Sequence, residues 1–190
     1  MSLPQQIALI NSLLMQHTFT APCFAQAQLY GIATDTPCGD TEQQPAYYPV
    51  MNGLNGESTD VSINDLLPLQ IYHRILSKTY TPKKTSVGDR QNICIEKTEV
   101  KMVVAGNTVL LSQSAFDLEG LMADTFPATM TQSQAHALGL LRMQVSLQRT
   151  VFDSLAVFTE EYKGVAPFLT AAQILFAMYY SMETEVCPTR

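Results

Sequence analysis

Alternation of apolar and polar residues is clearest in the last third of the chain. In Leu140–Val151, positions such as Met143 and Val145 are apolar and their neighbours are polar. This period of two predicts a β-strand, because successive side chains of a strand point to opposite faces. Ile174–Val186 has a similar pattern. A helix is its alternative, since TAAQIL contains good helix formers, but the paired tyrosines and the alternation into METEV favour a strand.

Two more segments have a strand pattern and flank a polar loop. In Leu67–Thr81, residues such as Ile71 and His73 fall on one face, and Asn92–Gly106 is rich in β-branched residues. We therefore predict a long antiparallel hairpin over residues 67–106 that protrudes as an arm. Because an isolated hairpin is marginally stable in water, it should pack on the rest of the chain or on a neighbour.

Two segments have helical spacing. The first starts at Ser2 as N-cap with Pro4 in the first turn, and it should end near His17. The second starts at Ser114 as N-cap. Together with Asp117 three residues later, Ser114 resembles a capping box with Asp in place of Glu, and the helix should end at Pro127.

The remaining segments carry weaker signals. Phe24–Ala33 is interpreted as a strand, residues 34–45 as a turn-rich loop, and residues 152–168 as another loop. Strands are grouped rather than alternating with helices. The sequence therefore predicts one α+β domain over 1–190, with a mostly antiparallel sheet and two helices packed on one face.

The composition suits a protein with a sizeable core and few surface charges. Hydrophobic residues make up 46% of the 190 residues, whereas charged residues make up only 15%. A free monomer normally has more surface charge. The low value is expected if neighbouring subunits cover much of the surface, or if the chain is a small soluble protein rich in Thr, Gln and Ser.

The net charge of −6 is unevenly distributed. Residues 1–73 contain no Lys or Arg, and most of the bases lie in residues 74–101. The basic segment lacks an Arg-rich run, which favours contact with another subunit over nucleic-acid binding. The bases of this segment are Arg74, Lys78, Lys83, Lys84, Arg90, Lys97 and Lys101.

No motif of catalysis or metal binding is evident. The four cysteines form no CxxC pair and fit no zinc spacing, so we expect free thiols and no metal site. No P-loop or GxGxxG motif predicts a cofactor. A Cys/His nucleophile pair, either Cys23 with His73 or Cys94 with His136, stays open as a minor alternative. Glu160 sits with Glu161 in a predicted loop and should face water. The N-terminal segment does not resemble a signal peptide, and no apolar run predicts a membrane span.

The order of elements resembles tail-terminator and neck-ring proteins, the head–tail connector virion proteins of tailed bacteriophages. Residues 138–187 resemble in sequence the C-terminal strands of small virion proteins from crAss-like phages of gut Bacteroidetes. The shared features include an FxxEY turn, here Phe158, Glu161 and Tyr162. The resemblance implies a structural protein, not an enzyme, in the virion neck or tail, made in the host cytoplasm. It implies a hexameric or dodecameric ring that contacts other neck, portal or tail proteins. DNA would pass through the channel without specific binding.

In such a ring, the basic hairpin could contact the acidic face of the next copy. Phe176, Met178, Tyr180 and Met182 would then face the core. The interface candidates are the seven bases above together with Tyr179, Glu183 and Glu185. The alternatives are a small α+β enzyme or ligand-binding protein, and an adaptor subunit of a secretion-type apparatus.

Overall fold

The computed structural model of the chain describes residues 2–38, 46–52, 58–82, 94–112, 115–132 and 143–186. The strands are β1 (Gln28–Cys38), β2 (Ala46–Asn52), β3 (Ser58–Asp60), β4 (Leu69–Pro82), β5 (Cys94–Asn107), β6 (Met143–Val151) and β7 (Gln173–Val186). The helices are α1 (Leu3–His17), the 3-10 turn η1 (Pro22–Phe24), α2 (Thr108–Leu111), α3 (Ala115–Gln132) and α5 (Ser154–Glu161).

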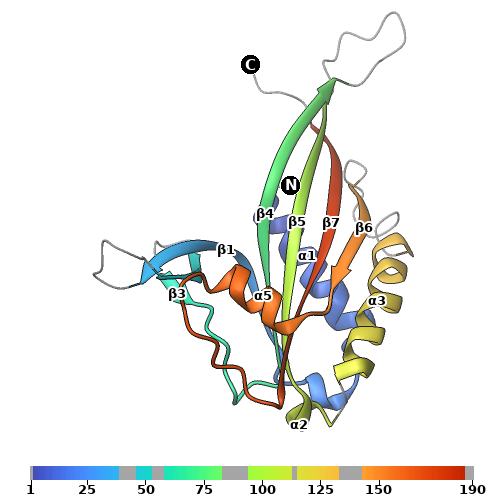
Figure 1. Cartoon of the computed structure of the whole chain (residues 1–190). Coiled ribbons are helices and arrows are strands. Elements are labelled where there is room, and N and C mark those ends of the chain that lie inside the picture. The colour runs from blue at the N-terminus through green and yellow to red at the C-terminus, as the bar shows by residue number, and fades with distance from the viewer. Residues whose placement is uncertain are drawn as a thin grey trace, which may run out of the picture.

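These strands form one sheet in the order β3-β2-β1-β4-β5-β7-β6. All neighbouring pairs are antiparallel except β1 and β4, which are parallel. Helices α1 and α5 lie on opposite sides of the sheet (Figure 1). The predicted α+β class with a mostly antiparallel sheet is therefore confirmed.

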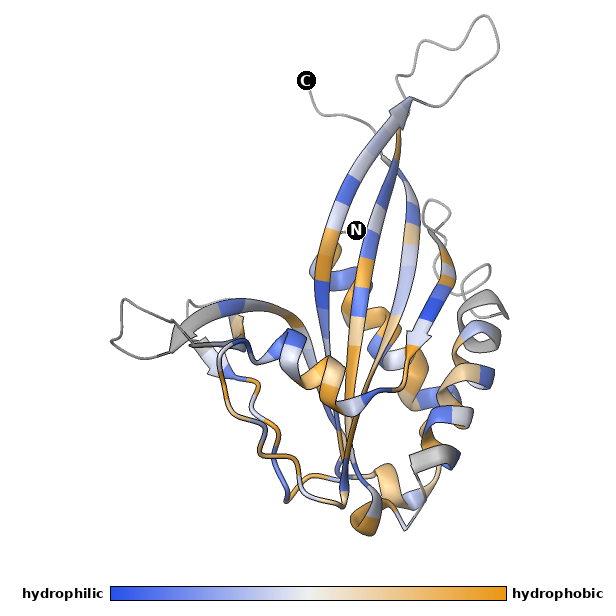
Figure 2. Cartoon of the chain, in the orientation of Figure 1, coloured by the Kyte–Doolittle hydropathy of each residue, from blue (hydrophilic) through white to orange (hydrophobic). Residues whose placement is uncertain are grey.

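The predicted hairpin forms the centre of the sheet. β4 and β5 are paired from Leu69 and Gly106 to Pro82 and Cys94, and β5 pairs along its whole length with β7. The hairpin is thus continuous with the core at its base and extends past β1 at its far end (Figure 1). Figure 2 shows that apolar residues concentrate at the base of these strands and polar residues toward the far end. The tip, residues 83–93, lies outside the described residues.

One face of the sheet is covered by α1 and α3, as the two predicted helices require. Buried residues of α1, such as Ile7 and Ile10, and of α3, such as Met122, pack with Phe176 of β7 in one core cluster. α1 begins as expected after Ser2, whose backbone N–H donates to the Gln5 side chain at 2.8 Å. This contact satisfies one of the free N–H groups at the helix start.

Helix α3 does not stop at Pro127, as the sequence pattern predicted, but continues to Gln132. A proline inside a helix removes one backbone hydrogen bond and crowds the preceding turn. Phe126 and Met122 are both completely buried against the sheet. Burial of these two side chains stabilises the part of the helix before Pro127. This offsets the free-energy cost of the lost hydrogen bond.

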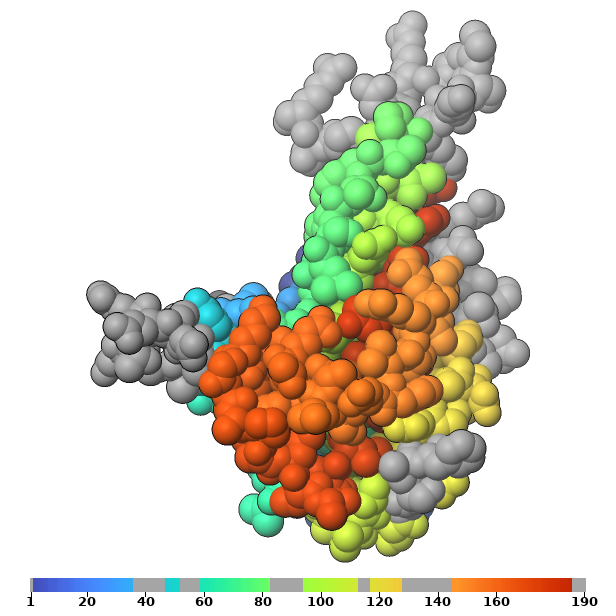
Figure 3. Space-filling model, in the orientation of Figure 1, coloured from blue at the N-terminus to red at the C-terminus, as the bar shows by residue number. Residues whose placement is uncertain are grey.

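The opposite face of the sheet carries a helix that the sequence pattern missed. Residues 152–168 were predicted as a loop, but Ser154–Glu161 is helix α5. The Asp153 side chain accepts a hydrogen bond from the Ala156 N–H at 3.0 Å, which caps its N-terminus. Figure 3 shows α5 and the segment after it lying over the front of the sheet. Helices therefore cover both faces rather than one.

Because of α5, both faces of β7 are buried. Phe176, Met178, Tyr180 and Met182 lie in the first core cluster, as predicted. Their neighbours Leu175, Ala177 and Tyr179 pack in a second cluster with Val157 and Phe158 of α5. The strand interpretation of this segment is confirmed, and the helix alternative is excluded.

Strand β1 differs from its prediction at both ends. Its predicted start is a 3-10 turn, in which Phe24 is buried against Phe19 with ring centroids 4.8 Å apart. Its far end, Thr34–Cys38, was predicted as loop but pairs with β2. Pro37 is tolerated there because, among the described strands, only β2 pairs with this part of β1. A proline lacks only the N–H that an edge strand can do without.

Candidate functional site

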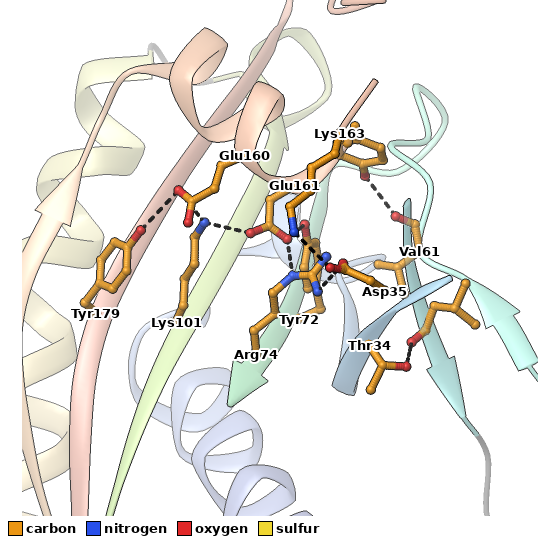
Figure 4. A network of polar contacts seen from close by, with 12 residues as sticks. Thr34, Asp35, Val61, Tyr72, Arg74, Lys101, Glu160, Glu161, Lys163 and Tyr179 are labelled. Carbon is orange, nitrogen blue, oxygen red and sulfur yellow. Dashed lines mark hydrogen bonds and ion pairs between the residues drawn. The ribbon is translucent and has the colours of Figure 1, made fainter. Parts of the chain in front are cut away.

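A group of six charged side chains lies where α5 meets the second face of the sheet. Three elements supply most of them: β4 gives Arg74, β5 gives Lys101, and the last turn of α5 gives Glu160 and Glu161. Asp35 from β1 and Lys163 complete the set (Figure 4). We call these six residues the ion cluster. It contains three acids and three bases, so its formal charges cancel.

Lys101 lies at the centre of the ion cluster. Its ammonium group is 2.7 Å from a carboxylate oxygen of Glu161 and 2.8 Å from one of Glu160. The side chain of Lys101 is 1% exposed. Burying an ammonium group costs free energy unless the group is paired with an acid. The two glutamates therefore allow Lys101 to lie in the interior.

Arg74 joins the ion cluster to β1. Its guanidinium pairs with Asp35 at 2.7 Å and also with Glu161. Glu161 accepts a further hydrogen bond from the Tyr72 hydroxyl at 2.9 Å. Lys163 extends the network by pairing with the other oxygen of Asp35 at 3.0 Å. Glu161 is therefore held by three side chains and is itself buried.

The pKa values in this region reflect both burial and pairing. Burial alone would lower the pKa of Lys101, but Glu161 and Glu160 outweigh it and raise that pKa above its usual value. Burial and the nearby Glu161 carboxylate raise the pKa of Tyr72 well above normal. For Glu160, burial is outweighed by Lys101, and its pKa is lowered. Pairing therefore favours the charged forms of both Lys101 and Glu160.

A groove of about 480 Å³ opens beside the ion cluster. It is lined by Thr34 and Asp35 of β1, by Ile75 and Leu76 of β4, and by ion-cluster residues of β5 and α5. The groove lies where β1 separates from β4, because their last paired residues are Ile32 and His73. One nitrogen of Arg74, Nη2, is buried and makes no hydrogen bond to a described group.

The contacts of the ion cluster fix α5 and β1 to the sheet. Each carboxylate of the ion cluster has a basic partner, so none of them is an unpaired base. Tyr72, with its raised pKa, stays protonated and donates its hydrogen bond. The described residues contain no group of three or more His, Cys, Asp or Glu side chains placed to hold a metal ion.

A second polar group is buried on the α1 face. His73 is completely buried, with Nε2 2.8 Å from Asn11 Oδ1 and Nδ1 3.0 Å from the Tyr180 hydroxyl. The Asn11 amide nitrogen donates to the Tyr30 carbonyl, which fixes its oxygen toward His73. Nε2–H therefore donates to Asn11, and Nδ1 accepts from Tyr180. Burial lowers the pKa of His73 to about 3, so the ring is neutral.

Both ring nitrogens of His73 are thus already hydrogen-bonded to Asn11 and Tyr180, which argues against the minor alternative of a Cys23–His73 nucleophile pair. Cys23 and Cys94 are free thiols in the structure. His136, the suggested partner of Cys94, lies outside the described residues.

The predicted interface bases are largely paired within the chain. Arg74 and Lys101 belong to the ion cluster, and Lys101 is not on the surface as a contact would require. Lys78 is 3.4 Å from Glu96, and Lys97 is 3.8 Å from Glu99, so both lysines have acidic partners within the hairpin. Lys83, Lys84 and Arg90 lie outside the described residues.

The three predicted interface residues of β7 are placed differently from one another. Tyr179 is 7% exposed and packs in the second core cluster, with Arg149 4.0 Å above its ring. Glu183 is exposed and Glu185 is half-buried. Tyr179 therefore belongs to the core, whereas Glu183 remains on the surface.

Sequence reasoning missed Asp35, Glu161 and Lys163 as members of one group. Glu160 and Glu161 were expected to face water, and this is wrong for Glu161, which is 1% exposed. The available signal was the position of Glu161 one turn after the apolar pair Val157 and Phe158. That spacing places Glu161 on the same helical face as these two residues.

No family model matches the chain, and no curated protein matches it. None of the described helices has both the length and the apolar character needed to cross a lipid bilayer.

Proposed function

We propose that the chain is a structural virion protein that forms a homo-oligomeric ring in the neck or tail of a tailed phage. It would act as a head–tail connector, tail terminator or tail-completion protein. In that role it lines the DNA channel and joins the portal or head to the tail.

The observation that carries the proposal is the set of large apolar side chains on the surface of a chain with few charges. Eight such side chains are 42–81% exposed. Exposed apolar residues that gather in patches are typical of protein–protein contacts. They are Leu66, Leu76, Tyr80, Val109, Leu110, Phe152, Leu155 and Phe168.

Three of these residues gather at the base of the sheet, at the end where β4 begins and β5 ends. Asn107 brings them together: its side chain donates to the Asp65 carbonyl at 3.0 Å and accepts from the N–H groups of Val109 and Leu110. Leu66, Val109 and Leu110 thus form an apolar end patch. A protein stacked between other virion components would use such an end to contact the next component.

The native mass tests this proposal. Light scattering after size exclusion, at low and moderate salt, should give a closed multiple of the 21.0 kDa chain, and electron microscopy should show rings. A monomer in all conditions, with no rings in the images, would contradict the proposal.

The groove beside the ion cluster favours a second candidate function, binding of a small charged ligand. Arg74 Nη2 is buried there without a partner, and a ligand carboxylate or phosphate would satisfy it. Thermal unfolding with and without inorganic phosphate or citrate tests this candidate. An unchanged unfolding temperature with both anions would exclude it for these ligands.

A further inference from the structure

β4 and β6 each have an edge that no described strand covers. β1 pairs with β4 only as far as Ile32 and His73, so β4 has β5 alone as its partner over Arg74–Pro82. We call this segment the open edge of β4. On the other side of the sheet, β6 pairs with β7 only. An uncovered edge has unpaired N–H and C=O groups that can bind another strand.

The two edges lie at the same height of the sheet. The pairing registers connect Ser146 of β6 through Ser181 and Glu99 to Ser77 of β4. By the same route, Met143 at one end of β6 is level with Tyr80. β6 has nine residues and thus extends along nearly the whole open edge.

The directions of the two strands also match. β4 is antiparallel to β5, β5 to β7, and β7 to β6, so β4 and β6 run in opposite directions. If a second copy lies beside the first in the same orientation, its β6 is antiparallel to the open edge of β4. Antiparallel pairing is the more stable arrangement for two strands.

We infer that neighbouring copies join through this pairing, β4 of one copy with β6 of the next, into one continuous antiparallel sheet. The inference rests on the proposed ring and names its subunit contact. The contact uses two different surfaces of the chain, so it is heterologous and can repeat around a closed ring.

The edges also share a local irregularity. β4 has an extra residue, Leu76, between the paired positions Ile75 and Ser77. β6 has an extra residue, Gln148, between Leu147 and Arg149. The registers place these two bulges one paired residue apart in height. Because a bulge bends its strand, both edges bend at nearly the same height.

Exposure favours a second copy as the partner. Leu76 and Tyr80 at the open edge are 49% and 60% exposed, and the contact would cover them.

Cysteine crosslinking tests the pairing. In the variant Ser77→Cys/Ser146→Cys, the two cysteines face each other only between copies. Cross-strand neighbours have Cβ atoms about 4.5–5.5 Å apart, which oxidation or a short bismaleimide can bridge. We expect a ladder of covalent multimers on a non-reducing gel, because each copy carries one new cysteine on β4 and one on β6 and can link to two neighbours. Each single variant is a control and should give no ladder, as should Ser77→Cys/Thr159→Cys, whose second thiol lies on α5.

Each outcome decides a different point. A ladder from the first variant alone supports the inferred contact. A wild-type oligomer whose double variant gives no ladder overturns the contact but leaves the proposed ring intact. A monomeric wild type without a ladder overturns both. Covalent dimers without higher multimers would indicate a two-fold contact and would also overturn the inference.

Discussion

The ammonium group of Lys101 lies 2.7 Å from the carboxylate of Glu161, and their side chains are only 1% and 2% exposed. One residue comes from the central strand β5 and the other from the last turn of α5. This pair, with Arg74 as a second base on Glu161, fixes the short helix to the sheet. It is the polar contact on which the second face of the fold depends.

We expect Glu161→Gln to lower the free energy of unfolding by about 3–5 kcal/mol, because Lys101 would lose its best-buried partner. Equilibrium urea unfolding measures this. The matched control is Glu160→Gln, whose side chain is 55% exposed although it pairs with the same ammonium. It should cost about 1 kcal/mol or less. Equal losses in the two variants would contradict the central role of Glu161.

The buried His73 should make stability fall as the pH falls. Burial lowers its pKa from the ordinary value of 6.5 to about 3 in the folded chain, so between these values the unfolded chain binds a proton that the folded chain does not. The free energy of unfolding should then decrease by about 1.4 kcal/mol per pH unit below 6.5. Urea unfolding across pH 7 to 4.5 measures the slope.

In the same series, His73→Gln should be less stable at pH 7 but should lose this slope. His17→Gln is the control, because His17 is exposed, and it should keep the slope.

The pKa values of Glu160 and Asp35 are lowered in the folded chain, although burial acts against this, because Lys101 pairs with Glu160 while Lys163 and Arg74 pair with Asp35. Their contribution is present above the usual carboxyl pKa values and is lost as the pH falls further.

Two glycines should respond oppositely to alanine. A Cβ on Gly106 would come within 2.8 Å of Leu118 and 3.3 Å of Ile174, so Gly106→Ala should cost about 1–3 kcal/mol through overpacking. A Cβ on Gly120 in α3 meets nothing within 4 Å. Gly120→Ala should therefore stabilise by about 0.5–1 kcal/mol through helix propensity. Thermal or urea unfolding compares the two, and a destabilised Gly120→Ala variant would contradict the described helix packing.

A charge placed on the open edge of β4 should weaken assembly. Leu76→Lys adds a cation where the neighbouring copy is proposed to pair, whereas its 49% exposure predicts little effect on folding. The expected result is a lower oligomeric mass by light scattering with an unchanged unfolding curve. Leu66→Lys is the comparison, since it adds the same charge at the end patch, and it should leave the subunit contact intact.

The bases of the hairpin tip give a separate prediction. Lys78 and Lys97 are paired within the hairpin, and Arg74 and Lys101 are paired in the ion cluster. An uncompensated charge of the basic segment would therefore have to come from Lys83, Lys84 or Arg90, which lie outside the described residues. Reversing these three to Glu should weaken the oligomer, and raising the salt concentration should weaken the wild type in the same direction. An unchanged oligomer would remove the tip from the assembly contact.

The sequence by itself determined the elements with a long, regular pattern. α1 follows from Ser2, Pro4 and the apolar spacing after them, and β7 follows from the alternation of Phe176 through Met182. The hairpin of β4 and β5 could be predicted from the sequence for the same reason. In each case the local pattern of side chains already specifies the type of element, although it did not show that both faces of β7 are buried.

Only the tertiary structure decided the second face of the sheet and the ion cluster. α5 has eight residues, too few for a clear helical period, and it is stabilised by packing on β7 and by the contacts of Glu161 with Lys101 and Arg74. Asp35 lies far before Glu161 in the chain, and no local pattern relates them. Their meeting depends on the pairing of β1 with β4 and of β5 with β7, which brings segments distant in sequence onto one face.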